Sequence, residues 1–409
     1  MARYILMAAL FALSLITYID RAAISSAKTA IGTELSLSDQ AIGYVFGAFA
    51  LGYALAQIPA GWFADRFGPR LALSLVVVVW SAFTGLTGRA QNLSYLIIVR
   101  FLFGVAEAGA FPGAARAIFN WLPASERGRA NGIMFSGTRI GAGLAFPLMA
   151  WLLGEWSWRN AFCLLALPGL LWAALWAVFF RNQPRTQAPA GAAAEASSLS
   201  FGQVFASRVM ALNMFQYFSG NFTFFICLSW MLPYLQKQFD LSLTGAAGYS
   251  MIPLLFGGTA QWVSGFLVDA LYRSRYRDWS RRGPAMAGFA LAAGAISLVS
   301  AMSSPLAAVI CFSLATFGAD MTISPSWAYC IDIGGKNSGA VSGSMNMVGN
   351  IGSFVSSLAF PFLFGLTGSA FTYFGVAAIL NVLSIACWQG MKPGRAIAGQ
   401  PVVRTLAGS

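Results

Sequence analysis

The sequence predicts an all-α membrane protein of twelve transmembrane helices, arranged as two six-helix halves with both termini in the cytoplasm. Three observations predict this fold: a deficit of charged residues, a series of long apolar segments, and a motif that recurs in each half. Hydrophobic residues make up 58% of the 409 residues, and charged residues make up 9%. A soluble globular chain carries about 25% charged residues, so we expect lipid to replace water around most of this protein.

Apolar segments follow one another along the whole chain. A helix that crosses a bilayer needs about 20 mostly apolar residues. The segments that meet this condition are 4–28, 41–64, 71–89, 93–119, 129–154, 159–181, 209–236, 245–271, 284–303, 306–331, 338–364 and 370–391. The first segment is long and continues through Asp20 and Arg21, which predicts a retained helix rather than a cleaved signal peptide.

Basic residues alternate between the connections of these segments. One set of connections and the two ends hold most of them, for example Arg127, Arg129 and the arginines within 273–282. The opposite connections hold Lys28, Arg89, Arg159 and Lys237. Cytoplasmic loops carry the excess of Lys and Arg, so both termini are predicted to be cytoplasmic. Without soluble domains or long loops, the chain is predicted to lie in a bacterial inner membrane.

An internal repeat supports the division into halves. Residues 56–65 read AQIPAGWFAD and residues 260–269 read AQWVSGFLVD, while LAFP occurs at both 144–147 and 358–361. Duplicated transporters place their substrate site between the halves near the membrane midplane. The predicted organisation is an N-terminal half 1–181, a Pro-, Ala- and Ser-rich cytoplasmic linker 182–208, a C-terminal half 209–391 and a cytoplasmic tail 392–409.

The stretch between the second and third segments carries a family resemblance. Residues 61–70 read GWFADRFGPR, which resembles the G-x-x-x-D-R-x-G-x-R signature of the major facilitator superfamily. In this motif, Gly61 allows close helix approach, and Asp65, Arg66 and Arg70 can bridge helix ends on the cytoplasmic face. We therefore predict that these four residues belong to a gate.

A narrower resemblance points to the anion:cation symporter branch of that superfamily. It is carried by YIDR at 18–21, RFLFGVAEAGAFP at 100–112 and NWLPASER at 120–127. That branch contains bacterial carriers of galactonate, glucarate, hexuronates and aromatic acids, and is related to animal sialic acid and vesicular glutamate transporters. The resemblance implies a transporter of a small organic anion that needs no cofactor.

Ionisable residues inside the apolar segments are functional candidates, because a charge within a bilayer is costly. The candidates are Asp20, Arg21, Arg100, Glu107, Arg139 and Asp320. At a rise of 1.5 Å per residue, Asp20 lies roughly 24 Å above the start of its helix, while Arg100 and Glu107 lie roughly 9 and 20 Å below the start of theirs. This depth places Asp20, Arg21 and Arg100 at one level, with Glu107 about two turns deeper.

This cluster suggests coupled binding of an anion and protons. Arg21 has a planar fork suited to a carboxylate, so we predict that it binds the substrate. The chain contains no histidine, so Asp20 and Glu107 are predicted to carry the protons. Arg100 is predicted to tune the proton affinity of these two carboxyl groups. The resemblance implies the same roles. The alternative is a set of fixed ion pairs that hold the first and fourth helices together.

Two further charges have open interpretations. Arg139 binds a second substrate carboxylate or forms a salt bridge to Glu107 or Asp20. It follows Thr138, where several sugar-acid carriers of the branch have a glutamine, which weakens the case for a sugar acid. Asp320 is a proton site, a partner for a substrate hydroxyl, or a neutral group hydrogen bonded to Ser324, Thr322 or a neighbouring helix.

Uncharged polar residues complete the predicted substrate site. The set comprises Tyr53, Thr138, Gln216, Asn221, Ser324, Trp327, Asn346 and Asn350. The resemblance implies binding roles for Tyr53, Ser324, Trp327 and one of Asn346 and Asn350. The alternative for each is hydrogen bonding between helices, which is common in membranes. Pro325 is expected to break its helix because it lacks a backbone donor.

The sequence also bears on which classes of protein function are predicted. The sequence shows no histidine, nucleophile elbow, metal spacing or phosphate loop, so an enzyme, a metal site and a catalytic residue are not predicted. The net charge is +12, and most of the basic residues lie between the apolar segments. They therefore indicate membrane topology rather than nucleic-acid binding. The prediction is proton-coupled symport of a small organic anion by alternating access, by a functional monomer in the lipid bilayer. The alternative is an organic-anion exporter or exchanger of the same superfamily.

Overall fold

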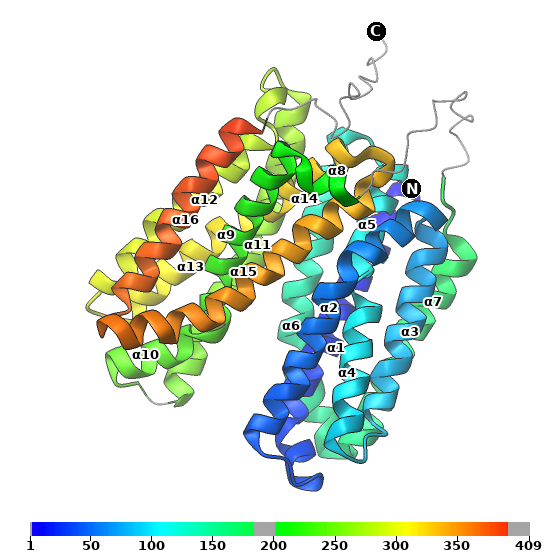
Figure 1. Ribbon diagram of the computed structural model, residues 1–409, viewed down its shortest axis with the longest axis vertical. Coiled ribbons are helices and arrows are strands. Elements are labelled where there is room, and N and C mark those ends of the chain that lie inside the picture. The colour runs from blue at the N-terminus through cyan, green and yellow to red at the C-terminus, as the bar shows by residue number, and fades with distance from the viewer. Residues whose placement is uncertain (1, 184–200, 242, 392–409) are drawn as a thin grey trace. The chain divides into compact units, whose positions relative to one another are not determined.

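The computed structural model describes residues 2–183, 201–241 and 243–391, and all regular structure in these ranges is helical, as predicted. Figure 1 shows the helices in chain order from blue to red. The α-helices are α1 (Ala2–Glu34), α2 (Asp39–Phe67), α3 (Pro69–Thr87), α4 (Leu93–Glu107), α5 (Ala110–Trp121), α6 (Arg127–Glu155), α7 (Trp158–Phe179), α8 (Phe201–Ala206), α9 (Arg208–Ser229), α10 (Met231–Phe239), α11 (Leu243–Arg273), α12 (Arg282–Leu298), α13 (Pro305–Met321), α14 (Ile323–Gly334), α15 (Ser338–Thr367) and α16 (Phe371–Gly390). Short 3-10 helices lie at Ala124–Glu126, Arg277–Trp279, Val299–Ala301 and Gly335–Asn337.

The apolar helices identify a multi-pass membrane protein. Within the described residues, 10 helical stretches are long and apolar enough to cross a membrane. One of them, Pro305–Thr367, runs through α13, α14 and α15, and α9 is not among them. The count of twelve spans and the cytoplasmic termini therefore remain predictions. The tail 392–409 and most of the linker 182–208 lie outside the described residues, and the end of that linker forms α8.

Short polar side chains determine where several helices begin. Ser38 accepts a hydrogen bond from the Ala41 N–H at the start of α2, and Asn92 accepts one from the Tyr95 N–H at the start of α4. Ser157 and Ser304 cap α7 and α13 in the same way. These side chains satisfy backbone donors that have no partner in the first turn of a helix.

Three of the expected spanning segments are each divided into two α-helices. Segment 209–236 is divided between α9 and α10, and segments 93–119 and 306–331 are divided in a way that resembles each other. The chain breaks after Glu107 between α4 and α5, and again at Thr322 between α13 and α14. In both cases a proline, Pro112 or Pro325, lies in the first turn of the following helix, where its missing N–H costs nothing. Both breaks follow a buried carboxyl residue, Glu107 or Asp320, which precedes its proline by the same spacing.

The chain forms two compact units. Unit 1 consists of Met1–Leu122, Met134–Ser198 and Lys336–Gly343, and unit 2 consists of Pro123–Ile133, Leu199–Gly335 and Ser344–Ser409. Helix α6 thus begins in unit 2 and continues in unit 1, whereas α15 begins in unit 1 and continues in unit 2. The predicted half 1–181 corresponds to most of unit 1, and the predicted half 209–391 to most of unit 2. The prediction does not assign Pro123–Ile133 to unit 2 or Lys336–Gly343 to unit 1.

Each unit has its own apolar core and closely packed helices. In unit 1, a Cβ added to Gly104 of α4 would lie 2.3 Å from the Phe49 carbonyl oxygen of α2. In unit 2, a Cβ added to Gly288 of α12 would lie 2.5 Å from the Gly318 carbonyl oxygen of α13. Small residues permit such close contacts between membrane helices. The core of unit 2 is rich in aromatic rings, including Tyr373.

Candidate functional site

An ion pair joins α1 and α4 in the interior of unit 1. Arg21 Nε lies 2.7 Å from Glu107 Oε2, and Glu107 is fully buried whereas the Arg21 side chain is 18% exposed. The Arg21 guanidinium carbon lies 4.3 Å from the ring centre of Tyr53, 5.0 Å from that of Tyr18 and 5.3 Å from that of Phe49. Aromatic faces stabilise a cation that is shielded from water.

Asp20 and Arg100 lie beside this pair, and both are buried. Thr84 of α3 donates a hydrogen bond of 3.4 Å to Asp20 Oδ2, and Asp20 is within electrostatic range of Arg100 and Glu107. The Arg100 guanidinium carbon lies 4.4 Å from the ring centre of Phe103. The structure therefore brings together the four charged residues that the sequence singled out in the first and fourth spanning segments.

Each member of this charged cluster has an unsatisfied polar atom. Asp20 Oδ1, Arg21 Nη2, Arg100 Nε and Glu107 Oε1 are buried without a hydrogen-bond partner among the described residues. Such an atom costs about 1–3 kcal/mol, and more when the group is charged. In a native protein it indicates a functional role or a bound water or ion. The cluster thus has capacity for a proton or an acidic ligand.

The predicted gating motif holds the start of a distant helix within unit 1. Asp65 accepts hydrogen bonds from the Gly339 N–H at 2.9 Å and from the Ala340 N–H at 2.7 Å, so it caps the first turn of α15. A negative charge is favourable at this position because of the helix dipole. Gly61 makes the approach possible, since a Cβ there would lie 2.3 Å from the Gly339 carbonyl oxygen.

The motif's arginines make different contacts. Arg70 donates to the Ala177 carbonyl oxygen near the end of α7, with Nε at 2.8 Å. Arg66 is exposed and lies over the rings of Trp62 and Phe67. Arg70 therefore ties α3 to α7 inside unit 1.

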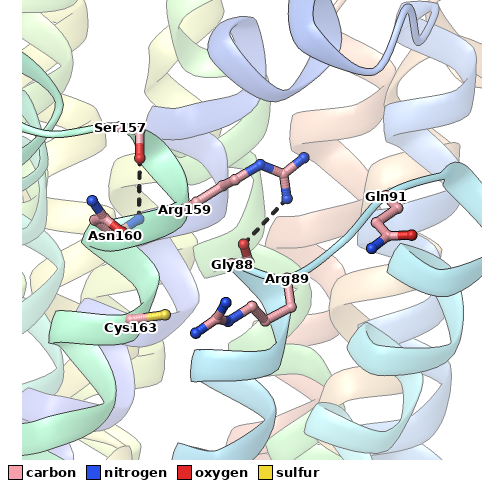
Figure 2. A pocket seen from close by; sticks show the side chains of 7 residues that line it. All are labelled: Gly88, Arg89, Gln91, Ser157, Arg159, Asn160 and Cys163. Carbon is pink, nitrogen blue, oxygen red and sulfur yellow. Dashed lines mark hydrogen bonds between the residues drawn. The ribbon is translucent and has the colours of Figure 1, made fainter.

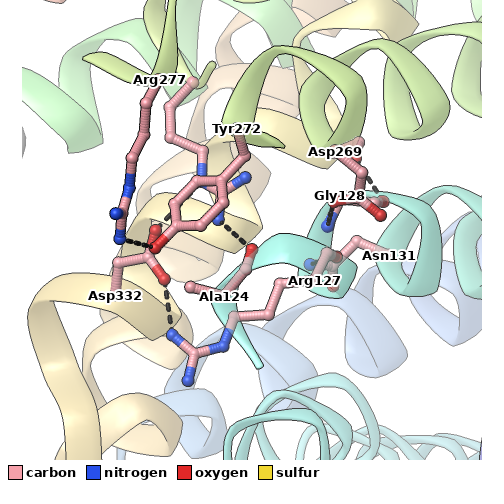
Figure 3. A network of polar contacts seen from close by, with 10 residues as sticks. Ala124, Arg127, Gly128, Asn131, Asp269, Tyr272, Arg277 and Asp332 are labelled. Atoms are coloured by element: carbon pink, nitrogen blue, oxygen red, sulfur yellow. Dashed lines mark hydrogen bonds and ion pairs between the residues drawn. The ribbon is translucent and has the colours of Figure 1, made fainter. Parts of the chain in front are cut away.

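The second copy of the repeat makes the same contacts in unit 2. Asp269 accepts hydrogen bonds from the N–H groups of Gly128 at 2.9 Å and Arg129 at 3.0 Å, and so caps the start of α6 (Figure 3). Gly265 allows the approach, because a Cβ there would lie 2.8 Å from the Gly128 carbonyl oxygen. The shared Gly and Asp of the sequence repeat therefore have the same structural role in both units.

A network of ion pairs lies next to this second cap. Asp332 accepts from Arg127 at 2.5 Å and from Arg281 Nε at 3.0 Å. Arg281 also donates to the Ala124 carbonyl oxygen at 2.7 Å, and Figure 3 shows Arg127 reaching toward Asp332. These contacts fix the segment before α6 to unit 2 through charged hydrogen bonds, which are stronger than neutral ones.

Two buried glutamines occupy the same position in the two copies of the repeat, and the effect of replacing them on the stability of the protein can be predicted. Gln57 and Gln261 are buried, and neither side-chain amide has a hydrogen-bond partner among the described residues. Gln57→Leu and Gln261→Leu should each stabilise the folded protein by about 1 kcal/mol, because they remove an unsatisfied buried amide. We expect Tm, measured by differential scanning fluorimetry in detergent, to rise by roughly 2 °C for each variant.

Gln216 is the matched control for this prediction. It is also a buried glutamine, but it donates to Asn213 and accepts from Ser326 at 3.2 Å and from Trp388 at 3.3 Å. Gln216→Leu should therefore lower Tm, because it leaves these partners unsatisfied. An equal fall in Tm for Gln57→Leu would contradict the prediction and show that water or another group satisfies its amide.

Several predicted substrate contacts of unit 2 are occupied by protein groups. The Trp327 indole N–H donates to the Tyr217 hydroxyl at 2.8 Å, and Ser324 donates to the Gly128 carbonyl oxygen at 2.7 Å. Asn221 and Asn350 donate to carbonyl oxygens one turn earlier in their own helices, those of Tyr217 and Asn346. The bonds of Trp327 and Ser324 join different helices, as in the alternative interpretation, whereas those of Asn221 and Asn350 stay within one helix.

Asp320 is buried in unit 2 near the end of α13. Its Oδ2 packs on the backbone of α11, since a Cβ on Gly257 would lie 2.1 Å from it. The hydroxyl groups of Ser324 and Thr322, the predicted partners of a neutral Asp320, donate instead to the carbonyl oxygens of Gly128 and Ala319. Those two donors are therefore engaged elsewhere.

Thr138 and Arg139 lie on α6 within unit 1. Thr138 is buried and donates to the Phe135 carbonyl oxygen at 2.6 Å, one turn earlier in its own helix. Arg139 is half-buried. The two predicted alternatives for Arg139, a second substrate carboxylate or a salt bridge to Glu107 or Asp20, both remain predictions.

Sequence reasoning missed several residues of the site. One of them is Arg116, whose Nε lies 4.0 Å from Asp65 Oδ1. Its charge inside the fourth apolar segment could have identified it. Tyr18 and Phe49 contact the Arg21 guanidinium, and their spacing from Arg21 and Tyr53 by three and four residues could have placed them on the same helix faces. Within the described ranges, no three His, Cys, Asp or Glu side chains are grouped to hold a metal ion.

The comparisons with known proteins identify the family. The family model described as Major Facilitator Superfamily matches residues 10–357, and the chain belongs to this superfamily. A solved proton:xylose symporter bound to 6-bromo-6-deoxy-D-glucose has the same fold, with a TM-score of 0.77 at 14% identity over 97% of both chains. The protein is therefore a transporter of this class and not an enzyme.

Curated relatives define the branch. The chain is 32% identical to a probable sulfoacetate transporter of Cupriavidus necator over 94% of its length and 93% of the relative's. It is 29% identical to the hexuronate transporter of Bacillus subtilis, covering 96% and 94%, and 30% identical to a probable galactarate/D-glucarate transporter of Escherichia coli, covering 93% of each. These relatives place the chain in an anion:cation symporter-type family.

Proposed function

We propose that this chain is a secondary active transporter that moves a small organic anion together with protons, as a functional monomer in a bacterial inner membrane. The observation that carries the proposal is the ion pair between Arg21 and Glu107, buried among aromatic rings, with one unsatisfied atom on each partner. Arg21 is a receptor for an acidic group, and Glu107 competes for the same guanidinium.

This competition would couple the two ligands. When Glu107 takes up a proton, its charge is lost and Arg21 becomes available to an acidic group of the substrate, which its planar fork suits. When the substrate leaves, ionised Glu107 pairs with Arg21 again. Asp20 is proposed as a second proton carrier, with Arg100 as the buried cation that tunes it. Alternating access would then release both ligands on the other side of the membrane.

The gating role of the signature motif is also a proposal. Asp65 caps the first turn of α15, and Asp269 caps the first turn of α6. Breaking either cap would expose unsatisfied backbone N–H groups, so we propose that these contacts form and break during each transport cycle. Gly61, Arg66 and Arg70 are proposed to belong to the same gate because they belong to the same motif.

The chemical class of the proposed substrate is set by the acidic group that Arg21 would bind. The relatives are named for sulfoacetate, hexuronate and galactarate or D-glucarate, all of which carry acidic groups. We propose a small carboxylate-bearing anion, with Tyr53, Thr138 and Arg139 as further contacts in unit 1. Corresponding roles for Asp320, Gln216, Asn221, Ser324, Trp327, Asn346 and Asn350 of unit 2 remain proposals.

Uptake into proteoliposomes tests this function. The purified chain is reconstituted with an inward proton gradient, and a panel of labelled sugar acids, aromatic carboxylates and sulfonates is supplied outside. Symport predicts accumulation of at least one class, and an ionophore that dissipates the gradient should abolish it. If nothing accumulates but preloaded anion leaves against an opposed gradient, the protein is an exporter or exchanger, and symport is wrong.

A further inference from the structure

A polar cavity lies in unit 1 at the end of α3 and the start of α7, and none of its lining residues belongs to the charged cluster. Its volume is about 410 Å³, and it is lined by Gly88, Arg89, Gln91, Ser157, Arg159, Asn160 and Cys163 (Figure 2). The cavity contains two of the basic residues that the sequence assigns to the poorly charged side of the membrane.

One of the two arginines builds the wall of the cavity. Arg159 Nε pairs with Glu34 Oε1 at 2.9 Å, and Arg159 Nη1 donates to the carbonyl oxygens of Gly88 at 3.2 Å and Ala90 at 2.6 Å. Trp158 also donates to Glu34, at 2.5 Å. Arg159 is therefore compensated in charge and holds the connection after α3 against α7.

Arg89 is different. It forms no ion pair and no side-chain hydrogen bond with the rest of the described chain. Figure 2 shows its guanidinium pointing toward α7, on the side of Cys163. Because Glu34 compensates Arg159, the cavity retains one positive charge, together with the amide groups of Gln91 and Asn160. This combination of donors is suited to an anionic group with several oxygen atoms.

An apolar surface continues from this cavity along α7. Asn160, Leu164, Leu167 and Leu171 follow one another at helical spacing and therefore lie on one face. The three leucines are 37%, 57% and 62% exposed, and Leu86 at the end of α3 is 40% exposed. A cationic, polar cavity next to an exposed leucine face matches an amphiphile with an anionic head and an apolar tail.

We propose that this cavity binds the phosphate group of an anionic phospholipid, with Arg89 as the charged contact and the leucine face of α7 against an acyl chain. Basic pockets between membrane helices bind anionic lipid head groups on the cytoplasmic side of other membrane proteins, and the proposal places the same chemistry on the opposite side of this protein. The bound lipid would bridge the ends of α3 and α7, so it should stabilise the folded protein.

The test measures lipid binding and does not depend on the transport substrate. The full chain is purified in neutral detergent and titrated with phosphatidylglycerol, with phosphatidylcholine as reference, and bound lipid is counted by native mass spectrometry while Tm is followed in parallel. Arg89→Gln should weaken phosphatidylglycerol binding roughly fivefold and reduce the lipid-dependent rise in Tm. Lys28→Gln is the matched control, because Lys28 is an exposed basic residue of the same predicted side that does not line the cavity.

Three outcomes would overturn the proposal. Equal lipid binding by Arg89→Gln and Lys28→Gln would show that only general surface charge attracts the lipid. Arg89-dependent stabilisation by inorganic phosphate or by the soluble head group glycerophosphoglycerol, as large as that by the lipid, would assign the cavity to a free anion. Unchanged binding in Leu167→Gln, whose leucine lies on the proposed acyl-chain face, would exclude that face as part of the site.

Discussion

Arg21→Ala is expected to abolish anion uptake, with an initial rate at least about 100-fold below that of the unmodified protein. The substitution removes the guanidinium that the proposed substrate would share with Glu107, and it leaves the buried Glu107 without its ion-pair partner. Arg21→Lys keeps the charge but loses the planar fork, so uptake should fall less, by roughly tenfold. Initial rates in proteoliposomes at several substrate concentrations measure both effects.

Lys28→Ala provides the control for these variants. Lys28 is an exposed basic residue on the same helix, outside the charged cluster, so its removal should leave uptake near the original rate. An Arg21→Ala protein that is folded by circular dichroism and still transports with an unchanged KM would show that Arg21 is only a structural link between α1 and α4. The proposed binding role would then be wrong.

Glu107→Gln is expected to separate anion transport from the proton gradient. The amide is nearly isosteric with the carboxyl group, but it cannot release a proton and does not compete for Arg21 as an anion. Each proton carried down a gradient of one pH unit supplies about 1.4 kcal/mol, or tenfold accumulation of substrate. Loss of one proton carrier should therefore lower the maximal accumulation ratio by about tenfold per pH unit, while exchange of labelled for unlabelled anion continues.

Two measurements distinguish coupling from general damage. Counterflow without a pH gradient reports whether Glu107→Gln still binds and releases substrate, and gradient-driven accumulation reports the coupling. Loss of both activities would indicate a structural role for Glu107. Retention of both would assign the proton to another group, and Asp20→Asn, tested in the same way, would then be the first variant to examine.

The sequence predicted the charged cluster because its members stand out in apolar segments. Asp20, Arg21, Arg100 and Glu107 are ionisable residues in the first and fourth of these segments, and they meet in unit 1. Depth arithmetic placed Glu107 about two turns deeper than Arg21, yet the two side chains form an ion pair. Helical rise gives the depth of a Cα atom, whereas the long side chains of Arg and Glu extend beyond it.

Other features of the site depend on contacts between distant segments, which no local pattern reveals. The sequence predicts Gln216 as a substrate contact, with hydrogen bonding between helices as the alternative. In the structure its side chain accepts from Ser326 and Trp388, which lie 110 and 172 residues further along the chain. The sequence also relates Glu107 to Asp320. Each is followed at the same spacing by a proline, Pro112 or Pro325, and the helix breaks between them at corresponding places in the two units.

The cap that Asp65 provides for α15 also constrains how the chain can fold as it leaves the ribosome. The backbone N–H groups that the carboxylate accepts from lie 274 and 275 residues later in the sequence, so they are synthesised after it. At a synthesis rate of about 5–20 residues per second, this delay is roughly 14–55 s. By the end of that interval the six predicted spanning segments within 4–181 have been made, but until then Asp65 has no helix to cap. Unit 1 therefore cannot complete its native contacts until most of unit 2 has been synthesised, and the nascent protein depends on water, lipid or the insertion machinery to satisfy this charge in the meantime.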